Sequence, residues 1–109
     1  FHLLEHMEFG DQLRFMYEAH RVLKPKGVLI TETPNIFNLD VGATGFYLDP
    51  THIRPLPWPL AQFMAEYAGF TEAKVQLLNP DPKAEDTTGA AEWQERLHGP
   101  RDFALVAHK

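Results

Sequence analysis

The run from Glu18 to Asn35, EAHRVLKPKGVLITETPN, constrains the fold more than any other part of the chain. Pro25 lacks a backbone N–H and disfavours helical geometry at the residue before it, so a helix must end there. Gly27 is expected to supply the unusual backbone angle of the turn. The apolar residues 28–30 then predict a strand covered on both faces. Thr33-Pro34-Asn35 ends that strand in a loop, at the edge where open α/β sheets bind ligands.

The rest of the chain continues this alternation of helix and strand. The expected elements are a helix at 11–23, a strand at 28–33, a long irregular connection at 34–58, a helix at 59–68, a strand at 73–78, a polar helix at 84–97 and a strand at 103–107. Asp11 is the expected N-cap of the first helix, and Gly69 the C-cap of the second. Apolar stripes at helical spacing mark residues expected in the core, namely Met16, Tyr17, Phe63, Met64 and Tyr67.

Length, charge and residue usage exclude several classes of protein. With 109 residues the chain is expected to form one small α/β domain. The formal net charge of −5 argues against nucleic-acid or anionic-membrane partners. The absence of cysteine excludes disulfides and thiolate sites. No apolar stretch reaches the roughly 20 residues of a membrane helix, and no signal sequence is recognisable, so a cytoplasmic location is expected.

Several segments, in order along the chain, match one family. They are LLEHM at 3–7, EAHRVLKPKG at 18–27, VLITETPN at 28–35, FYLDPTHIRPL at 46–56, EYAGF at 66–70 and LHGPRDFALVAHK at 97–109. With these segments the chain resembles the C-terminal half of a class I S-adenosylmethionine-dependent methyltransferase. The segment at 46–56 resembles more narrowly the bacterial methyltransferases associated with surface-glycan biosynthesis.

The resemblance implies a Rossmann-like sheet with flanking helices. Residues 28–33 would be its fifth strand, 73–78 its sixth, and 103–107 its seventh, which is antiparallel and lies between the other two. Residues 1–4 would end the fourth strand. No G-x-G occurs in the sequence, so the glycine-rich cofactor loop has no counterpart. Residues 1–109 are therefore expected to be a partial domain that lacks the N-terminal half, which binds S-adenosylmethionine.

Histidines and a glutamate mark the expected reaction centre. In related methyltransferases with a Glu-x-x-Glu-His motif, acidic residues and a histidine hold a divalent metal. The matching residues are Glu5 and His6, with His2 in place of the first glutamate and His52 as a further ligand from the long loop. Such ligands suit Zn²⁺, Mn²⁺ or Fe²⁺. Alternatively, Glu5 and His6 brace the next helix, or His6 or His52 is the general base. His52 could also be a loop histidine bonded to backbone.

Four further residues are candidates for acceptor binding. Asn35 follows the fifth strand, but could instead be a turn amide bonded to its own backbone. Tyr47, Asp49 and Arg54 lie in the segment at 46–56, where they suit a polar, sugar-like acceptor. An ion pair between Asp49 and Arg54 that fixes the loop is the alternative.

The resemblance predicts O-methylation of a glycan or small-molecule hydroxyl, with the isolated chain inactive. One alternative is a non-catalytic half-domain that forms a homodimer, or pairs with another chain, through an exposed sheet edge. The other is a small metal-binding module built on the histidines and Glu5.

Overall fold

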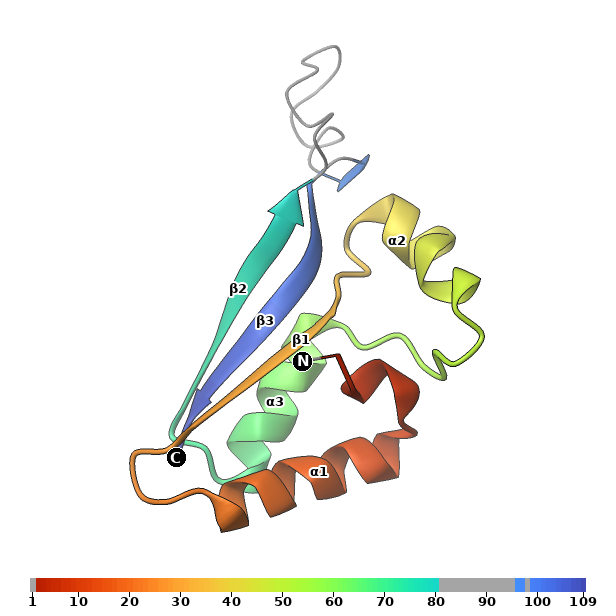
Figure 1. Ribbon diagram of the computed structural model, residues 1–109. Coiled ribbons are helices and arrows are strands. Elements are labelled where there is room, and N and C mark those ends of the chain that lie inside the picture. The colour runs from red at the N-terminus through yellow and green to blue at the C-terminus, as the bar shows by residue number, and fades with distance from the viewer. Residues whose placement is uncertain (1, 81–95, 98) are drawn as a thin grey trace.

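The computed structural model describes residues 2–80, 96–97 and 99–109. Its elements are η1 (Leu4–His6), α1 (Phe9–Val22), β1 (Val28–Pro34), α2 (Leu39–Ala43), η2 (Gly45–Leu48), α3 (Trp58–Ala68), β2 (Glu72–Pro80) and β3 (Pro100–His108) (Figure 1). The polar helix predicted at 84–97 lies almost entirely outside the described residues.

The three strands form one sheet in the order β1-β3-β2, with β3 antiparallel to both neighbours. In the register of the sheet, Val106 of β3 lies opposite Ile30 on one side and Lys74 on the other. This is the arrangement predicted for the fifth, seventh and sixth strands, and the predicted α/β fold is confirmed.

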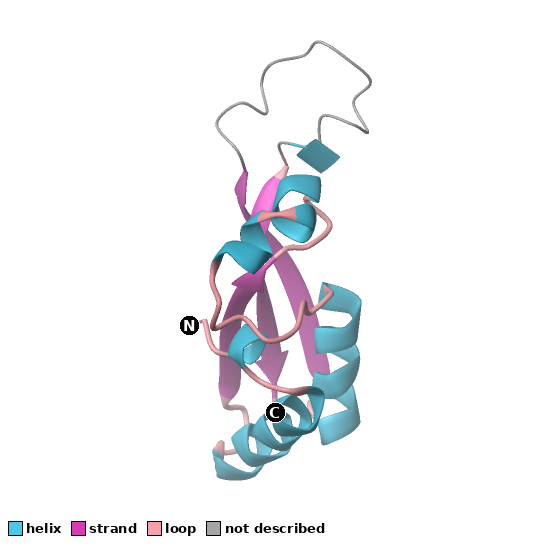
Figure 2. Cartoon of the chain, turned by 90° about the vertical axis from the view of Figure 1, so that its right-hand side faces the viewer, coloured by secondary structure: helices cyan, strands magenta, loops and turns pink. Residues whose placement is uncertain are grey.

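Helices α1 and α3 lie on the same face of the sheet (Figure 2). Leu29 of β1 and Phe103 and Leu105 of β3 point into the core against Met16 of α1 and Met64 of α3. Because side chains alternate along a strand, the next residues point to the other face.

That other face is open to solvent along β1. Val28 is 41% exposed and Ile30 is 54% exposed, whereas Leu29 between them is 9% exposed. The prediction of a strand covered on both faces is therefore wrong for this chain. The described helices pack against one face only, so only one face of the apolar run at 28–30 is buried.

Helix α1 begins earlier than predicted. Glu8 is its N-cap, with extended backbone angles and no side-chain cap, and its carbonyl accepts the N–H of Gln12 at 2.9 Å. The helical hydrogen bonds thus start before Asp11, which lies in the first turn. Gln12 is fully buried, and its Nε2 donates to the carbonyl of Leu4 at 2.8 Å. This bond ties η1 to α1.

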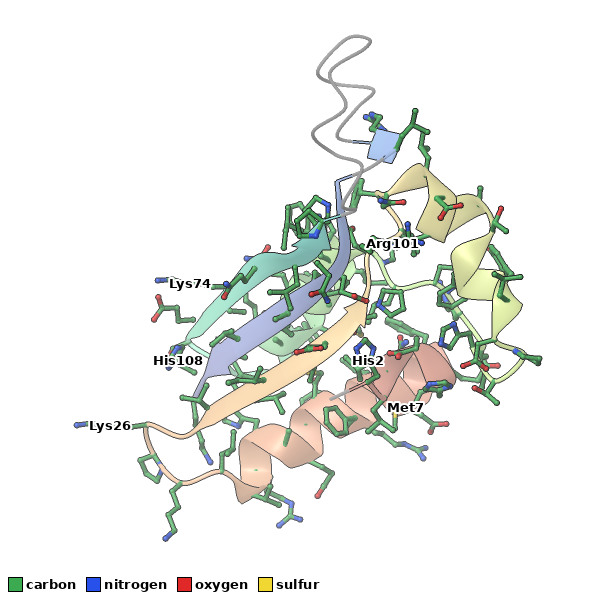
Figure 3. All side chains as sticks on the ribbon, turned by 45° about the horizontal axis from the view of Figure 1, so that its top comes forward. His2, Met7, Lys26, Lys74, Arg101 and His108 are labelled. Atoms are coloured by element: carbon green, nitrogen blue, oxygen red, sulfur yellow. The ribbon has the colours of Figure 1, made fainter. Side chains whose placement is uncertain are left out.

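The turn after α1 differs from the prediction in one detail. Lys26, at the tip of the turn (Figure 3), has the positive φ of 68°, and Gly27 does not. Gly27 is needed for another reason, because a Cβ there would lie 2.8 Å from the carbonyl oxygen of Lys24. The turn therefore selects glycine for close backbone approach.

Three aromatic residues predicted in the core lie on the surface instead. Tyr17, Phe63 and Tyr67 are 44%, 57% and 62% exposed. Tyr67 packs edge-on against Tyr17 and stacks with Phe63, at ring-centroid distances of 6.3 Å and 5.8 Å. The apolar stripe of each helix is wider than its contact with the sheet, so only Met16 and Met64 of these five residues reach the core.

The connection predicted as irregular contains α2 and η2. Asn38 begins α2, since its Oδ1 accepts the N–H of Val41 at 3.1 Å. The boundaries of α3 agree with the prediction, with Pro59 in its first turn and Gly69 as its C-cap at φ 116°. Across residues 2–80, 96–97 and 99–109, no helix has the length and apolar character needed to cross a membrane.

Candidate active site

Two segments distant in sequence meet beside the carboxyl end of β1. The N–H of Ile53 donates to the carbonyl of Glu5 at 2.8 Å, which joins the long loop to η1. His2 forms a single parallel bridge with Glu32 of β1, and Figure 3 shows His2 beside this strand. Only this bridge agrees with the prediction that residues 1–4 end a neighbouring strand, because η1 begins at Leu4.

The two candidate catalytic histidines lie together in this site. The imidazole rings of His6 and His52 have their centroids 4.8 Å apart. Nδ1 of His6 lies 2.9 Å from the carbonyl oxygen of Thr51, and Nδ1 of His52 lies 2.7 Å from that of Phe46. A carbonyl oxygen only accepts, so each Nδ1 must donate. In the neutral form of each ring, Nε2 then carries the lone pair. The prediction that His52 bonds to backbone is confirmed, and that bond leaves Nε2 available.

Glu5 supplies a buried carboxylate to the same site. Its side chain is 1% exposed. Oε1 lies 3.2 Å from Nδ1 of His2 and 3.7 Å from Nε2 of His6, while Oε2 is buried without a hydrogen-bond partner. Burying a carboxylate oxygen without a partner is costly, so this atom marks a place where a cation or donor would be stabilised.

Three of the four predicted metal ligands come together. Glu5, His6 and His52 each offer one ligand atom, and these atoms lie within 4.8 Å of one another. His2 is not part of this group. Its Nδ1 lies 3.2 Å from Oε1 of Glu5 and its Nε2 lies 3.3 Å from Oε2 of Glu32. The predicted set of four is therefore reduced to three, with His2 bridging two carboxylates beside it.

Asn35 has the geometry of a turn amide bonded to backbone, which was the alternative to acceptor binding. The residue is 4% exposed, its Nδ2 donates to the carbonyl of Pro100 at 3.0 Å, and its Oδ1 accepts the N–H of Phe37 at 3.2 Å. Both ends of the amide are thus occupied by backbone groups, and the residue holds the start of the loop against β3.

Within the described residues, no hydrogen bond or ion pair joins the other candidate acceptor residues to one another. Tyr47 is 62% exposed. The guanidinium of Arg54 lies 5.7 Å from the centre of the Phe9 ring, as in a cation–π contact, and not against Asp49. The alternative of an Asp49–Arg54 ion pair is therefore wrong.

The carboxylate of Asp49 is engaged within its own loop. Oδ1 accepts the hydroxyl of Thr51 at 2.6 Å and the N–H of Thr51 at 2.9 Å. These two hydrogen bonds, with a smaller contribution from the positive potential of His52 and His6, hold the pKa of Asp49 below its ordinary value.

Sequence reasoning missed three residues that shape the site. Thr51 and Phe46 provide the acceptors for the two histidines, and Gln12 anchors η1. Asp-Pro-Thr-His is a turn pattern in which an aspartate bonds the backbone two residues on, and this signal could have identified Thr51. A backbone carbonyl such as that of Phe46 leaves no such signal.

Comparison with known proteins identifies relatives of one kind. No family model matches the chain. A probable S-adenosylmethionine-dependent methyltransferase of Mycolicibacterium smegmatis is 37% identical over 70 residues, which make up 64% of this chain and 26% of that protein. The crystal structure of a SAM-dependent methyltransferase from Archaeoglobus fulgidus superposes with a TM-score of 0.86 at 26% identity. That match covers 99% of this chain and 56% of the other.

These matches support the resemblance drawn from the sequence. The chain spans about a quarter of the curated relative and just over half of the solved structure. It therefore has the fold of part of a SAM-dependent methyltransferase.

Proposed function

We propose that this chain is the acceptor-side part of a SAM-dependent methyltransferase that methylates a hydroxyl group of a glycan or a small molecule. The observation that carries the proposal is the pair of imidazoles, His6 and His52, whose Nδ1 atoms donate to backbone and whose Nε2 atoms remain available beside the carboxyl end of β1. That edge is where open α/β sheets bind ligands. The two related methyltransferases, one by sequence and one by structure, support the reaction class.

S-adenosylmethionine would supply the methyl group for direct transfer to the acceptor oxygen. As that oxygen becomes alkylated, its proton must leave, and the Nε2 lone pair of His6 or His52 can accept it. The His52 side chain is 13% exposed and that of His6 is 31% exposed. His6 is therefore the more accessible of the two bases.

A divalent metal at the same residues is the second candidate function. Nε2 of His6 faces Oε1 of Glu5 at 3.7 Å, and Nε2 of His52 faces Oδ2 of Asp49 at 3.5 Å. A cation placed between each nitrogen and its carboxylate oxygen would be attracted by both atoms. The donor set of two imidazoles and the buried Glu5 carboxylate fits Zn²⁺, Mn²⁺ or Fe²⁺. Bound there, the metal would act as a Lewis acid on the acceptor oxygen.

The acceptor contacts of this proposal fall mainly on two side chains. Asn35 and Asp49 direct their polar atoms at the protein itself. Tyr47 exposes its ring, and Arg54 lies in the same loop as His52. An aromatic ring and a guanidinium suit a polar, sugar-like acceptor. This match supports a glycan or a hydroxylated small molecule.

Methyl transfer by the full protein that contains this chain tests the proposal. Loss of the histidine that accepts the proton, by His6→Ala or His52→Ala, is expected to lower the rate by about 10²–10⁴-fold, the usual contribution of a general base. His108→Ala is the matched control, since His108 lies at the opposite end of the sheet, opposite Val28. Rates of both site variants equal to that of His108→Ala would refute the role of the two histidines.

The isolated chain is expected to bind S-adenosylmethionine weakly or not at all, because its sequence has no G-x-G. Calorimetric titration of S-adenosylmethionine into residues 1–109 measures this directly. Micromolar affinity would contradict the division into a cofactor half and an acceptor half.

The alternative function is a half-domain that pairs with a partner or with itself. The free edge of β1 supports this alternative. Among the described residues, that edge has only the bridge from His2 to Glu32, and Val28 and Ile30 are exposed beside it. Unpaired strand edges recruit other strands. Sedimentation velocity on the chain distinguishes the two, since a clean monomer at high concentration would count against pairing.

A further inference from the structure

We propose that Asp49 and Thr51 are positioning residues, which hold His6 and His52 so that Nε2 of both rings is presented to one reaction centre. Sequence reasoning placed Asp49 in acceptor binding and assigned no role to Thr51. The inference rests on the proposed function, because it takes the two histidines as the chemical groups of the site.

The segment Asp49-Pro50-Thr51-His52 is a closed turn. Oδ1 of Asp49 accepts both the N–H and the hydroxyl of Thr51, at 2.9 Å and 2.6 Å. The carbonyl of Asp49 accepts the N–H of His52 at 3.1 Å. Pro50 has a fixed φ, which lowers the entropy cost of forming the turn. Asp49 thus bonds the backbone on both sides of residue 51, through its side chain at the Thr51 N–H and through its carbonyl at the His52 N–H.

This turn determines which nitrogen of His6 carries a proton. The Thr51 hydroxyl has a single proton, which it donates to Asp49, so its oxygen can only accept from His6. The carbonyl of Thr51 also only accepts, and both oxygens lie 2.9 Å from Nδ1 of His6. Two acceptors on Nδ1 require an N–H at that position. Nε2 is then the lone-pair nitrogen in the neutral ring.

The same turn places the second histidine. His52 follows Thr51 directly, and its Nδ1 donates to the carbonyl of Phe46 at 2.7 Å. The next residue, Ile53, bonds to the carbonyl of Glu5 and so fixes the turn against η1. Both rings therefore have the same tautomer, and their centroids are 4.8 Å apart. Such outer partners of reacting or metal-binding histidines fix the tautomer and the ring orientation.

A direct chemical role for the Asp49 charge is the competing explanation. Its Oδ2 lies 3.5 Å from Nε2 of His52, which is too long for a hydrogen bond. Asp49→Asn separates the two roles, because the amide oxygen can accept the same two hydrogen bonds from Thr51 without a negative charge. Asp49→Ala removes both the acceptor and the charge.

The test measures the tautomer of each histidine in the metal-free chain. The protein is labelled with ¹⁵N-histidine, and the imidazole nitrogen chemical shifts report the tautomer. The spectra are recorded at a pH of about 8.5, where histidine is ordinarily neutral. In the wild type and in Asp49→Asn, His6 and His52 are expected to be protonated at Nδ1. Asp49→Ala should shift His6 to a mixture of tautomers. Asp40→Ala is the matched control, since Asp40 pairs with Arg101 and not with the turn.

Zinc affinity provides a second measurement. Zn²⁺ alone, titrated into the same proteins, is expected to bind at least about tenfold more weakly to Asp49→Ala than to Asp49→Asn or Asp40→Ala. If no variant binds Zn²⁺ but the tautomers behave as stated, the positioning role stands and the metal proposal fails. The role is overturned if wild-type His6 is protonated at Nε2, or if Asp49→Ala has the tautomers of Asp40→Ala.

Thr51→Val keeps the test decisive if Asp49→Ala does not fold. Thr51 contacts the ring of His6 through its hydroxyl and its carbonyl, and Thr51→Val removes only the hydroxyl, whereas His52 bonds to Phe46. The variant should therefore move the nitrogen shifts of His6 and leave those of His52 near their wild-type values. Unchanged shifts of His6 would also overturn the role of the threonine.

Discussion

At the scale of single residues, the site is defined by where polar atoms find their partners. Asp49, Thr51 and His6 form a continuous series of hydrogen bonds, and each fixes the next. The carboxylate of Glu5, in contrast, has one buried oxygen without a partner. A hydrogen-bonded turn therefore lies beside a buried carboxylate oxygen that a cation or a donor would stabilise.

The pKa of Asp49 gives a prediction at this scale. It lies below the ordinary value mainly because the Thr51 hydroxyl donates to the carboxylate. This stabilisation is complete above the unfolded pKa of about 3.9 and is lost as the pH falls through the lower folded value. Thr51→Val should raise the pKa of Asp49 towards the ordinary value and weaken this acid dependence. A carboxyl ¹³C titration measures the shift, with Thr71→Val as the control, and an unchanged titration would contradict the assigned cause.

At the scale of elements, the two faces of α1 differ in what they contribute. Met16 is fully buried, whereas its neighbour Tyr17 is 44% exposed. Met16→Ala is expected to lower the free energy of unfolding by about 2–5 kcal/mol through loss of burial and a cavity. Tyr17→Ala should cost distinctly less. Urea denaturation of both variants measures the difference, and equal losses would show that the aromatic surface cluster contributes as much as the core.

Two glycines in helices make a matched pair for backbone packing. A Cβ at Gly42 in α2 would lie 2.4 Å from the carbonyl oxygen of Ile36, whereas one at Gly10 in α1 would meet nothing within 4 Å. Gly42→Ala is therefore expected to destabilise the fold by about 1–3 kcal/mol. Gly10→Ala should stabilise it by up to about 1 kcal/mol, because alanine favours the helix. Thermal unfolding gives both signs, and a neutral Gly42→Ala would show that the loop before α2 can shift.

At the scale of the whole molecule, the open sheet face and the free edge of β1 determine how the chain behaves alone. Ile30 on that face is 54% exposed. If the chain self-associates, Ile30→Lys should lower its association constant at least about tenfold, since an exposed charge opposes strand pairing. Leu29 beside it is buried, so the fold should persist. Sedimentation equilibrium measures the change, and association unaffected by the lysine would place the interface elsewhere.

The sequence by itself determined the order of the main helices and strands and their approximate boundaries, and it proposed candidate residues for a reaction centre. It could do so because Pro25, Gly69 and the apolar periodicity act locally, through backbone geometry and side-chain spacing. The tertiary structure alone decided which face of β1 is covered, and which of Met16 and Tyr17 is buried. It also decided that His2 lies outside the group formed by Glu5, His6 and His52.

These outcomes depend on partners distant in sequence, and on backbone carbonyls that every residue carries. A backbone oxygen at Phe46 or Thr51 has no sequence signature, yet it determines which nitrogen of each neutral histidine carries the proton. Local physics therefore made the elements predictable from the sequence. The chemistry of the site required the contacts between them.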